Sequence, residues 1–374
     1  MLYSIVGRLN VMLKLSADKI KEYLSSVYKT NVEIKFVGRL GEKKETYEKE
    51  LKGFGYGIPY IIAFDVDGET KYVVLETMRA EGFGHDHFSD RAQVLLWQHS
   101  AFNKLPKHVK SVDVGAFTID DSMKTLGDCK EFFIVTELAT GMLYNNDLDR
   151  IKEMMDLNSL DEERCVALSD YLAGVHGVKK DDPQCYVRRV RDLVGHGEGI
   201  MGLMDSYPPN LKYISEKDLC EIEKKCVEWR WRLKRMTHRL CQVHGDYHPW
   251  NIMFKKGVDF MVLDRSRGEW GEPADDVSAL TINYLFYSLQ TFGELTGPFE
   301  TLWKLFWKNY LDRTGDKEIL NIVQPFFAWR GLVVASPVWY PNLPLDVRKK
   351  LFNFVKKVLK TNKFDITDVN SYIR

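Results

Sequence analysis

The pattern of apolar and polar positions changes near residue 140. Before that point most apolar runs alternate with polar residues, which predicts half-buried strands. Two of these runs are separated by Asp67-Gly68, a pair typical of a hairpin turn. The predicted strands lie in residues 31–40, 59–78, 107–120 and 131–140, and helical spacing occurs in residues 16–28 and 89–102. This part therefore predicts a small, mostly antiparallel sheet with an interposed helix.

Helical spacing dominates the rest of the chain. Val166, Leu168, Leu172 and Val175, for example, share one face of a predicted helix. Further helices are predicted in residues 216–238, 276–292, 298–311, 319–336 and 344–360. Two short apolar runs, NIMF and FMVLD, interrupt them and predict a short hairpin inserted among helices. We expect a strand-rich N-terminal lobe followed by a larger helical lobe.

Composition narrows the class of protein. The chain has 374 residues, of which 45% are hydrophobic and 28% charged, with a formal net charge of +0. This is typical of a soluble globular protein and gives no reason to expect a nucleic acid or a membrane as partner. No apolar run reaches the roughly 20 residues that span a bilayer. Six cysteines without a C-x-x-C pair indicate reduced thiols, so we expect a cytoplasmic protein.

The segment CQVHGDYHPWNIMF, residues 241–254, concentrates chemistry-bearing side chains: His244, Asp246, His248 and Asn251. Asp264 follows at the end of the next apolar run. Two chemistries fit this pattern. One is a metal site of the H-x-D-x-H type in a metallohydrolase, and the other is the catalytic and magnesium-binding loop of a phosphotransferase.

Phosphoryl transfer needs a carboxylate for the acceptor hydroxyl and hard oxygen ligands for Mg²⁺. Asp246 is the candidate for the first task, and Asn251 and Asp264 are candidates for the second. We expect His244 to fix the loop backbone. The metal alternative needs its residues on one face, as in a strand, whereas the glycine and proline of this segment indicate a loop.

The strings HGDYHPWN, VLD and GEPADD together resemble the aminoglycoside phosphotransferase and choline kinase family. That family has H-G-D-x-x-x-x-N, then an apolar strand ending in Asp, then G-x-P-x-x-D. Upstream, LSDYLAGVHG resembles its Leu-x-x-Leu-His helix, and FFIVTELATG resembles its hinge. The resemblance implies an α+β, bilobal, protein kinase-like fold. Residues 1–137 would form a strand-rich nucleotide lobe, and residues 138–374 a helical catalytic and substrate lobe.

Roles carried over residue by residue follow from this resemblance. It implies that Asp246 is the catalytic base and that Asn251 and Asp264 hold Mg²⁺. Asp276 would tie the start of a helix to the catalytic loop. We group His244 with Asp246 as a catalytic-loop residue. The resemblance also implies ATP as cofactor, with backbone groups of the hinge segment meeting the adenine. The hinge residues are Glu137, Leu138 and Ala139.

One departure from the family concerns the phosphates of ATP. Where the family has a strand lysine paired with a helix glutamate, this chain has Glu76 and Gln93. A glutamate facing a triphosphate repels it, so another cation must compensate. The candidates are Arg79 just beyond the strand, Arg91 on the helix and a lysine of the segment GEKKETYEKELKGFGYG, and we select Arg79. The glycine-rich flap that ends near Gly53 and Gly55 is a candidate for backbone contacts to phosphate.

Two functions from different classes follow. The first is an ATP-dependent kinase that transfers the γ-phosphate to a hydroxyl of a small acceptor. We expect an amine- or sugar-like acceptor because Glu269, Glu272 and Asp275 follow the motif. The second is a catalytically inactive pseudokinase that binds a nucleotide or ligand, motivated by Glu76 and Gln93.

Overall fold

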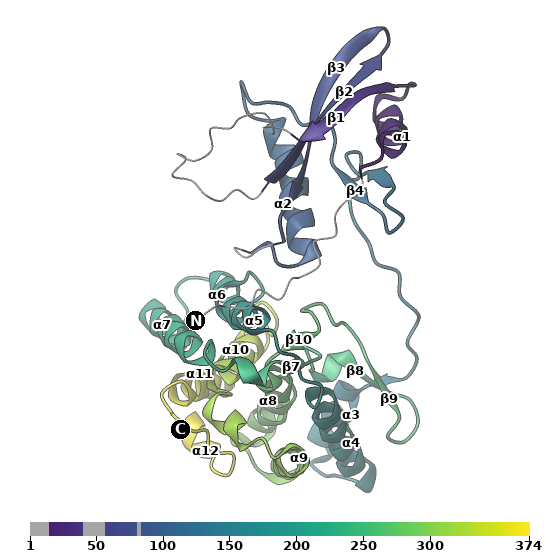
Figure 1. Ribbon diagram of the computed structural model, residues 1–374. Helices are drawn as coiled ribbons and strands as arrows, with labels where there is room; N and C mark the ends of the chain where they lie inside the picture. The colour runs from purple at the N-terminus through teal and green to yellow at the C-terminus, as the bar shows by residue number, and fades with distance from the viewer. Residues whose placement is uncertain (1–14, 40–56, 81–83) are drawn as a thin grey trace, which may run out of the picture. The chain divides into compact units, whose positions relative to one another are not determined.

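The structure, a computed structural model, describes residues 15–39, 57–80 and 84–374 (Figure 1). It divides into two compact units, Met1–Thr136 and Glu137–Arg374. We describe each unit by itself. The predicted flap glycines Gly53 and Gly55 lie outside the described residues.

The first unit contains a three-stranded antiparallel sheet in the order β1-β2-β3. The strands are β1 (Glu33–Arg39), β2 (Gly57–Val66) and β3 (Glu69–Met78), and α1 (Ala17–Tyr28) accompanies them. Apolar side chains of α1 and the sheet form one small buried cluster: Ile20, Leu24, Val32, Ile62, Phe64 and Val66. The predicted turn is confirmed, since Asp67 and Gly68 have φ angles of 51° and 83°, as a two-residue hairpin turn requires.

The rest of this unit differs partly from the prediction. Helix α2 (Phe88–Phe102) forms as expected. Of residues 107–120, only β4 (Gly115–Phe117) is a strand, and it pairs with β5 (Met123–Thr125). The strand predicted in residues 131–140 was wrong, because none forms there. A strand needs a neighbour for its backbone groups, and this segment has no strand partner among the described residues.

The second unit is mainly helical. Its N-terminal half contains α3 (Tyr144–Met154), α4 (Ser159–His176), α5 (Pro183–Gly195), α6 (Ile200–Asp205) and α7 (Glu216–Leu233). Its C-terminal half contains α8 (Pro273–Phe292), α9 (Gly297–Thr314), α10 (Gln324–Ala335), α11 (Leu345–Val358) and α12 (Asn370–Ile373). No helix in the described part of the chain is long and apolar enough to cross a bilayer.

Helix α8 forms the centre of this unit. All of its residues from Pro273 to Leu289 are buried, and it packs against α9, α10 and α3. Its first turn carries the acidic residues Asp275 and Asp276. A helix N-terminus favours negative charge because its first backbone N–H groups have no intrahelical partners. The buried start of α8 therefore places two carboxylates in the interior of the unit.

Two small sheets lie among these helices. One has the order β6-β8-β9, with strands β6 (Met142–Leu143), β8 (Ile252–Phe254) and β9 (Phe260–Val262). Strands β8 and β9 form the hairpin predicted from the sequence. The other sheet pairs β7 (Cys241–Gln242) with β10 (Trp270–Gly271). The loop between β7 and β8 carries the HGDYHPWN segment.

Candidate active site

The backbone of the loop between β7 and β8 is anchored by Asp276, which is fully buried. The N–H groups of His244 and Gly245 donate to its two carboxylate oxygens, each at 2.7 Å. Gly245 has a φ of 85°, a conformation that glycine adopts without strain. Asp276 thus ties the start of α8 to this loop, the position that the family resemblance implied for it.

The anchor continues behind the loop. Asp276 lies 3.1 Å from Nε2 of His176 in α4, and the Nδ1 of His176 is 2.7 Å from the hydroxyl of Tyr310 in α9. Burial alone would raise the pKa of Asp276, but the His176 contact and the loop N–H groups outweigh it and lower the pKa. Residues of α4, α8 and α9 therefore form one chain of contacts, through which Asp276 anchors the loop between β7 and β8.

His244 turns its side chain to the backbone of the loop. Its Nδ1 accepts a hydrogen bond from the N–H of Asp246 at 3.2 Å. Burial lowers the pKa of His244, against the opposing charge of Asp276. A neutral ring that accepts a backbone N–H fixes the turn on which Asp246 lies, which is the role expected for His244 from the sequence.

The carboxylate of Asp246 is buried and bound by two arginines. Nη1 of Arg330 and Nη1 of Arg267 both donate to its Oδ1, at 2.6 and 2.8 Å. Its Oδ2 has Nε2 of His248 at 3.6 Å. Burial alone would raise the pKa of Asp246, but the charges of Arg330, His248 and Arg267 hold it far below its usual range. Asp246 is therefore an ionised, weakly basic carboxylate.

Arg330 belongs to α10 and was not singled out in the sequence. It also donates to Asp275 at 2.8 Å and to the carbonyl of Gly245 at 3.3 Å. Its guanidinium lies over the ring of Trp329 at 3.9 Å, and that of Arg267 lies over the same ring at 4.5 Å. A lone charge in the apolar run FFAWRGLVV is the signal that points to a buried partner.

Asn251 lies just before β8, and Asp264 lies just after β9, at the same end of the β8–β9 hairpin. The N–H of Leu263 donates to the carbonyl of Asn251 at 2.8 Å, and Asp264 is the next residue. The Nδ2 of Asn251 donates to the carbonyl of Asp246 at 3.1 Å, which fixes the orientation of the amide. Asp264 is exposed, with no hydrogen bond or ion pair to any residue that the structure describes.

Asp264 also has a φ of 53°, a left-handed conformation that non-glycine residues adopt at a cost. Such strain persists where the surrounding structure enforces it, and it is concentrated at functional sites. The amide oxygen of Asn251 and the carboxylate of Asp264 are both hard oxygen donors, and the Leu263–Asn251 backbone bond brings the two chain segments together. Mg²⁺ takes one or two carboxylates together with phosphate oxygens and water, so this donor set fits Mg²⁺.

The carboxylates expected to face the acceptor have other partners. Glu272 accepts from Arg239 and from the hydroxyl of Tyr186 and caps the N-terminus of α8. Asp275 is bound to Arg330. Glu269 accepts from Nε1 of Trp270 at 2.8 Å and is exposed. Two of the three carboxylates on which the amine expectation rested are therefore neutralised inside the unit.

Most of the residues predicted to contact the nucleotide are exposed. In the first unit, Glu76 on β3, Arg79 after it and Gln93 on α2 are all exposed, and no hydrogen bond or ion pair joins Glu76 to Gln93 within the described chain. At the start of the second unit, residues 137–139 belong to no helix or strand, and of the three only Ala139 is half-buried. These assignments remain predictions.

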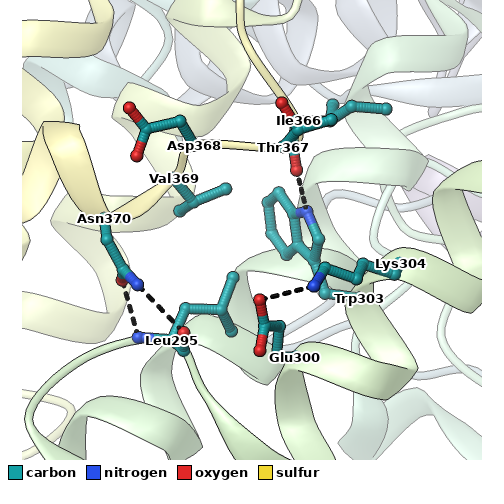
Figure 2. A pocket seen from close by; sticks show the side chains of 9 residues that line it. All are labelled: Leu295, Glu300, Trp303, Lys304, Ile366, Thr367, Asp368, Val369 and Asn370. Atoms are coloured by element: carbon teal, nitrogen blue, oxygen red, sulfur yellow. Dashed lines mark hydrogen bonds and ion pairs between the residues drawn. The ribbon is translucent and has the colours of Figure 1, made fainter.

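A metal cluster and a hollow beside α9 are two other candidate sites. Within the described residues, no three His, Cys, Asp or Glu side chains group closely enough to hold a metal, so the geometry does not support the metallohydrolase alternative. A hollow between α9 and residues 366–370 has several of its polar groups paired with one another (Figure 2). There Nε1 of Trp303 donates to the carbonyl of Ile366 at 2.9 Å, and Asn370 bonds the backbone of Leu295.

Comparison with known proteins agrees with the sequence prediction. Residues 138–293 match the model of the phosphotransferase enzyme family. This match covers the loop between β7 and β8, the β8–β9 hairpin and α8. It confirms the resemblance predicted from the motifs, the α+β kinase-like fold and the class of enzyme, a phosphotransferase. No curated protein was found to match the chain.

Solved structures of similar proteins are distant. An amicoumacin kinase is 15% identical, with 89% of this chain and 91% of that chain covered and a TM-score of 0.41. An ethanolamine kinase of Plasmodium vivax is 13% identical, with 84% and 77% covered and a TM-score of 0.34. A choline kinase of Streptococcus pneumoniae is 14% identical, with 91% and 98% covered and a TM-score of 0.31. Likeness at this level carries no argument about the acceptor or the mechanism of this protein.

Proposed function

We propose that this protein is an ATP-dependent small-molecule kinase that transfers the γ-phosphate to a hydroxyl group of a small acceptor. The observation that supports it best is the pair of carboxylates with opposite surroundings on one short segment. Asp246 is buried and fixed, as a residue that orients a hydroxyl must be. Asp264 is exposed and has no partner among the described residues, which suits a residue that binds a metal.

In this proposal Asp246 receives the acceptor hydroxyl on Oδ2, since Oδ1 already accepts two arginine bonds. Its low basicity suits a transfer with a loose transition state, in which positioning of the hydroxyl contributes more than early proton removal. The proton passes to Asp246 late, as the new O–P bond forms. His244 holds the loop on which this carboxylate lies.

Asn251 and Asp264 would hold Mg²⁺ through the amide Oδ1 and the carboxylate. The ion supplies positive charge to the phosphate oxygens and so stabilises the transferring group. The glycine flap and Arg79 are the proposed phosphate contacts of the first unit, and residues 137–139 are the proposed adenine contacts. Arg79 takes the place of the family's strand lysine, because Glu76 does not supply a cation.

For the acceptor, we retain the class expected from the sequence, an amine- or sugar-like compound with a free hydroxyl. Because Glu272 and Asp275 are engaged by Arg239 and Arg330, these two carboxylates give no binding energy to an ammonium group. The geometry therefore favours a polyhydroxylated acceptor over a simple amino alcohol. A location in the cytoplasm, where ATP is available, belongs to the same proposal.

The test begins with the nucleotide. Binding of ATP and ADP is measured by calorimetry with and without Mg²⁺, on the wild type, Asp264→Ala and Asp259→Ala. Asp259 is an exposed aspartate in the turn of the same hairpin and is the matched control. We expect magnesium-dependent binding that Asp264→Ala abolishes and Asp259→Ala retains. Loss in both variants would contradict the assignment of Asp264.

The second step is a screen of sugars, amino sugars and amino alcohols with γ-labelled ATP. Transfer to at least one hydroxyl establishes the kinase. Nucleotide binding with no transfer to any acceptor favours the pseudokinase alternative, which Glu76 and Gln93 motivate. Absence of binding to ATP, ADP and GTP would defeat the kinase and indicate a ligand-binding module.

A further inference from the structure

Arg330 connects three parts of the helical unit. It extends from α10, is 5% exposed, and bonds Asp246 of the catalytic loop and Asp275 in the first turn of α8. Helices α8 and α10 pack against each other, so the arginine bridges an existing helix contact (Figure 1). Its third bond goes to the carbonyl of Gly245, next to the carboxylate that it holds.

The sequence around Arg330 is otherwise apolar, and a buried guanidinium is unfavourable unless it is paired and hydrogen-bonded. Asp246 and Asp275 pair its two Nη groups and the face of Trp329 covers it, while its buried Nε has no hydrogen-bond partner among the described residues. The planar fork of an arginine can bond two carboxylates at once, which a lysine cannot do with the same geometry. Arg330 contacts each of these three residues.

The consequence for Asp246 is geometric. Oδ1 accepts from Arg330 and Arg267, while the sole contact of Oδ2 within the described chain is the longer one to His248. Because Arg330 is buried and bound at both ends, it has little freedom to move, whereas Arg267 is 22% exposed at its side chain. Arg330 is therefore the less mobile of the two arginine contacts to Oδ1, and both arginine bonds fall on that one oxygen.

We propose that Arg330, held by Asp275, is a positioning residue that fixes the carboxylate of Asp246 with one oxygen available to the acceptor hydroxyl. This inference rests on the proposed function for its catalytic consequence. Its structural content, that Asp246 loses its orientation without Arg330, is independent of that function. Neither Arg330 nor Asp275 needs to contact substrate.

The competing explanation is that Arg330 merely joins α8 to α10. A set of variants separates the two: Arg330→Met, Asp275→Asn and the double variant Arg330→Met/Asp275→Asn. In Arg330→Met the buried Asp275 loses its partner, so thermal stability falls. The double variant removes that unpaired carboxylate and recovers much of the stability. It does not recover the contact to Asp246.

We expect kcat to fall on the order of 10²-fold in Arg330→Met and to remain equally low in the double variant, because a misplaced reacting group costs about this much. The KM for ATP should be unchanged. Arg330→Lys should recover part of kcat, since it retains a cation near Asp246. Recovery of kcat together with stability in the double variant would overturn the proposal.

The matched control is the buried pair Arg164–Asp147, joined at 2.6 Å between α4 and α3 with no contact to Asp246. Arg164→Met and Arg164→Met/Asp147→Asn should show the same fall and recovery of stability. Their kcat should stay near that of the wild type. A loss of kcat equal to that of the Arg330 variants would assign the effect to general loosening of the unit.

A crystal structure of the double variant gives a readout that needs no activity. We expect the Asp246 carboxylate to be rotated or to occupy more than one orientation. An unchanged carboxylate overturns the positioning role. If the wild type proves inactive on all acceptors, the proposed function fails, and the crystal structure still decides whether Arg330 positions Asp246.

Discussion

The loop between β7 and β8 and the end of the β8–β9 hairpin each present a carboxylate, and the two carboxylates have opposite surroundings. Asp246 in the loop is 8% exposed and bound by Arg330 and Arg267. Asp264 at the hairpin end is exposed, unpaired among the described residues, and strained at a φ of 53°. The partners of Asp246 are residues of the protein itself, whereas the carboxylate of Asp264 is open to solvent. This difference agrees with the proposed roles, in which Asp246 orients the acceptor and Asp264 binds the metal.

The largest expected effect comes from a substitution of Asp246, the carboxylate of the loop. Asp246→Asn retains the shape of the side chain but removes the charge that receives the hydroxyl proton. We expect kcat to fall roughly 10²–10⁴-fold, measured by steady-state transfer to the best acceptor. Asp259→Asn, in the turn of the hairpin, should transfer at the wild-type rate. Turnover by Asp246→Asn close to wild type would remove Asp246 from the mechanism.

The next effect concerns the anchor of the loop. Asp276→Asn leaves one acceptor oxygen for two loop N–H donors, those of His244 and Gly245. Because the site is buried, an amide N–H group then faces a backbone N–H group without water. We expect the free energy of unfolding to fall by about 2–4 kcal/mol, measured by urea denaturation. A change below 0.5 kcal/mol, the usual size of an exposed substitution, would show that Asp276 does not carry the loop.

The pH dependence of stability sharpens this result. The folded-state pKa of Asp276 is lowered, so its contribution is fully present above the ordinary carboxyl pKa and is lost as pH falls through the folded value. The stability difference between wild type and Asp276→Asn should therefore be largest near neutral pH. It should narrow below about pH 4. Denaturation midpoints across this range measure it, and a difference independent of pH would contradict the assigned charge state.

How far the sequence predicted these features depends on the range of the interactions. Helices α4, α7, α8, α9, α10 and α11, the hairpin and the segment carrying Asp246, Asn251 and Asp264 follow from local spacing and could be predicted, whereas α3, α5 and α6 were not predicted. Residues 131–140 have the composition of a strand, but a strand also needs a partner, which composition does not reveal. Arg330 lies 84 positions from Asp246, and their contact depends on how α10 packs against α8. Only the lone charge in an apolar run hinted at it.

The smallest expected effect tests the hairpin side of the comparison, and its sign is opposite to that at Asp276. In Asp264→Gly the left-handed φ of 53° no longer strains a side chain. We expect the free energy of unfolding to stay constant or rise by up to about 1 kcal/mol, measured without nucleotide or metal. The same variant should lose magnesium-dependent nucleotide binding. Asp259→Gly is the control. Asp259 does not have a positive φ, so its replacement by glycine relieves no backbone strain. If Asp264→Gly were clearly destabilised without ligand, Asp264 would have a structural partner, and the contrast between a completed loop and an open hairpin end would be lost.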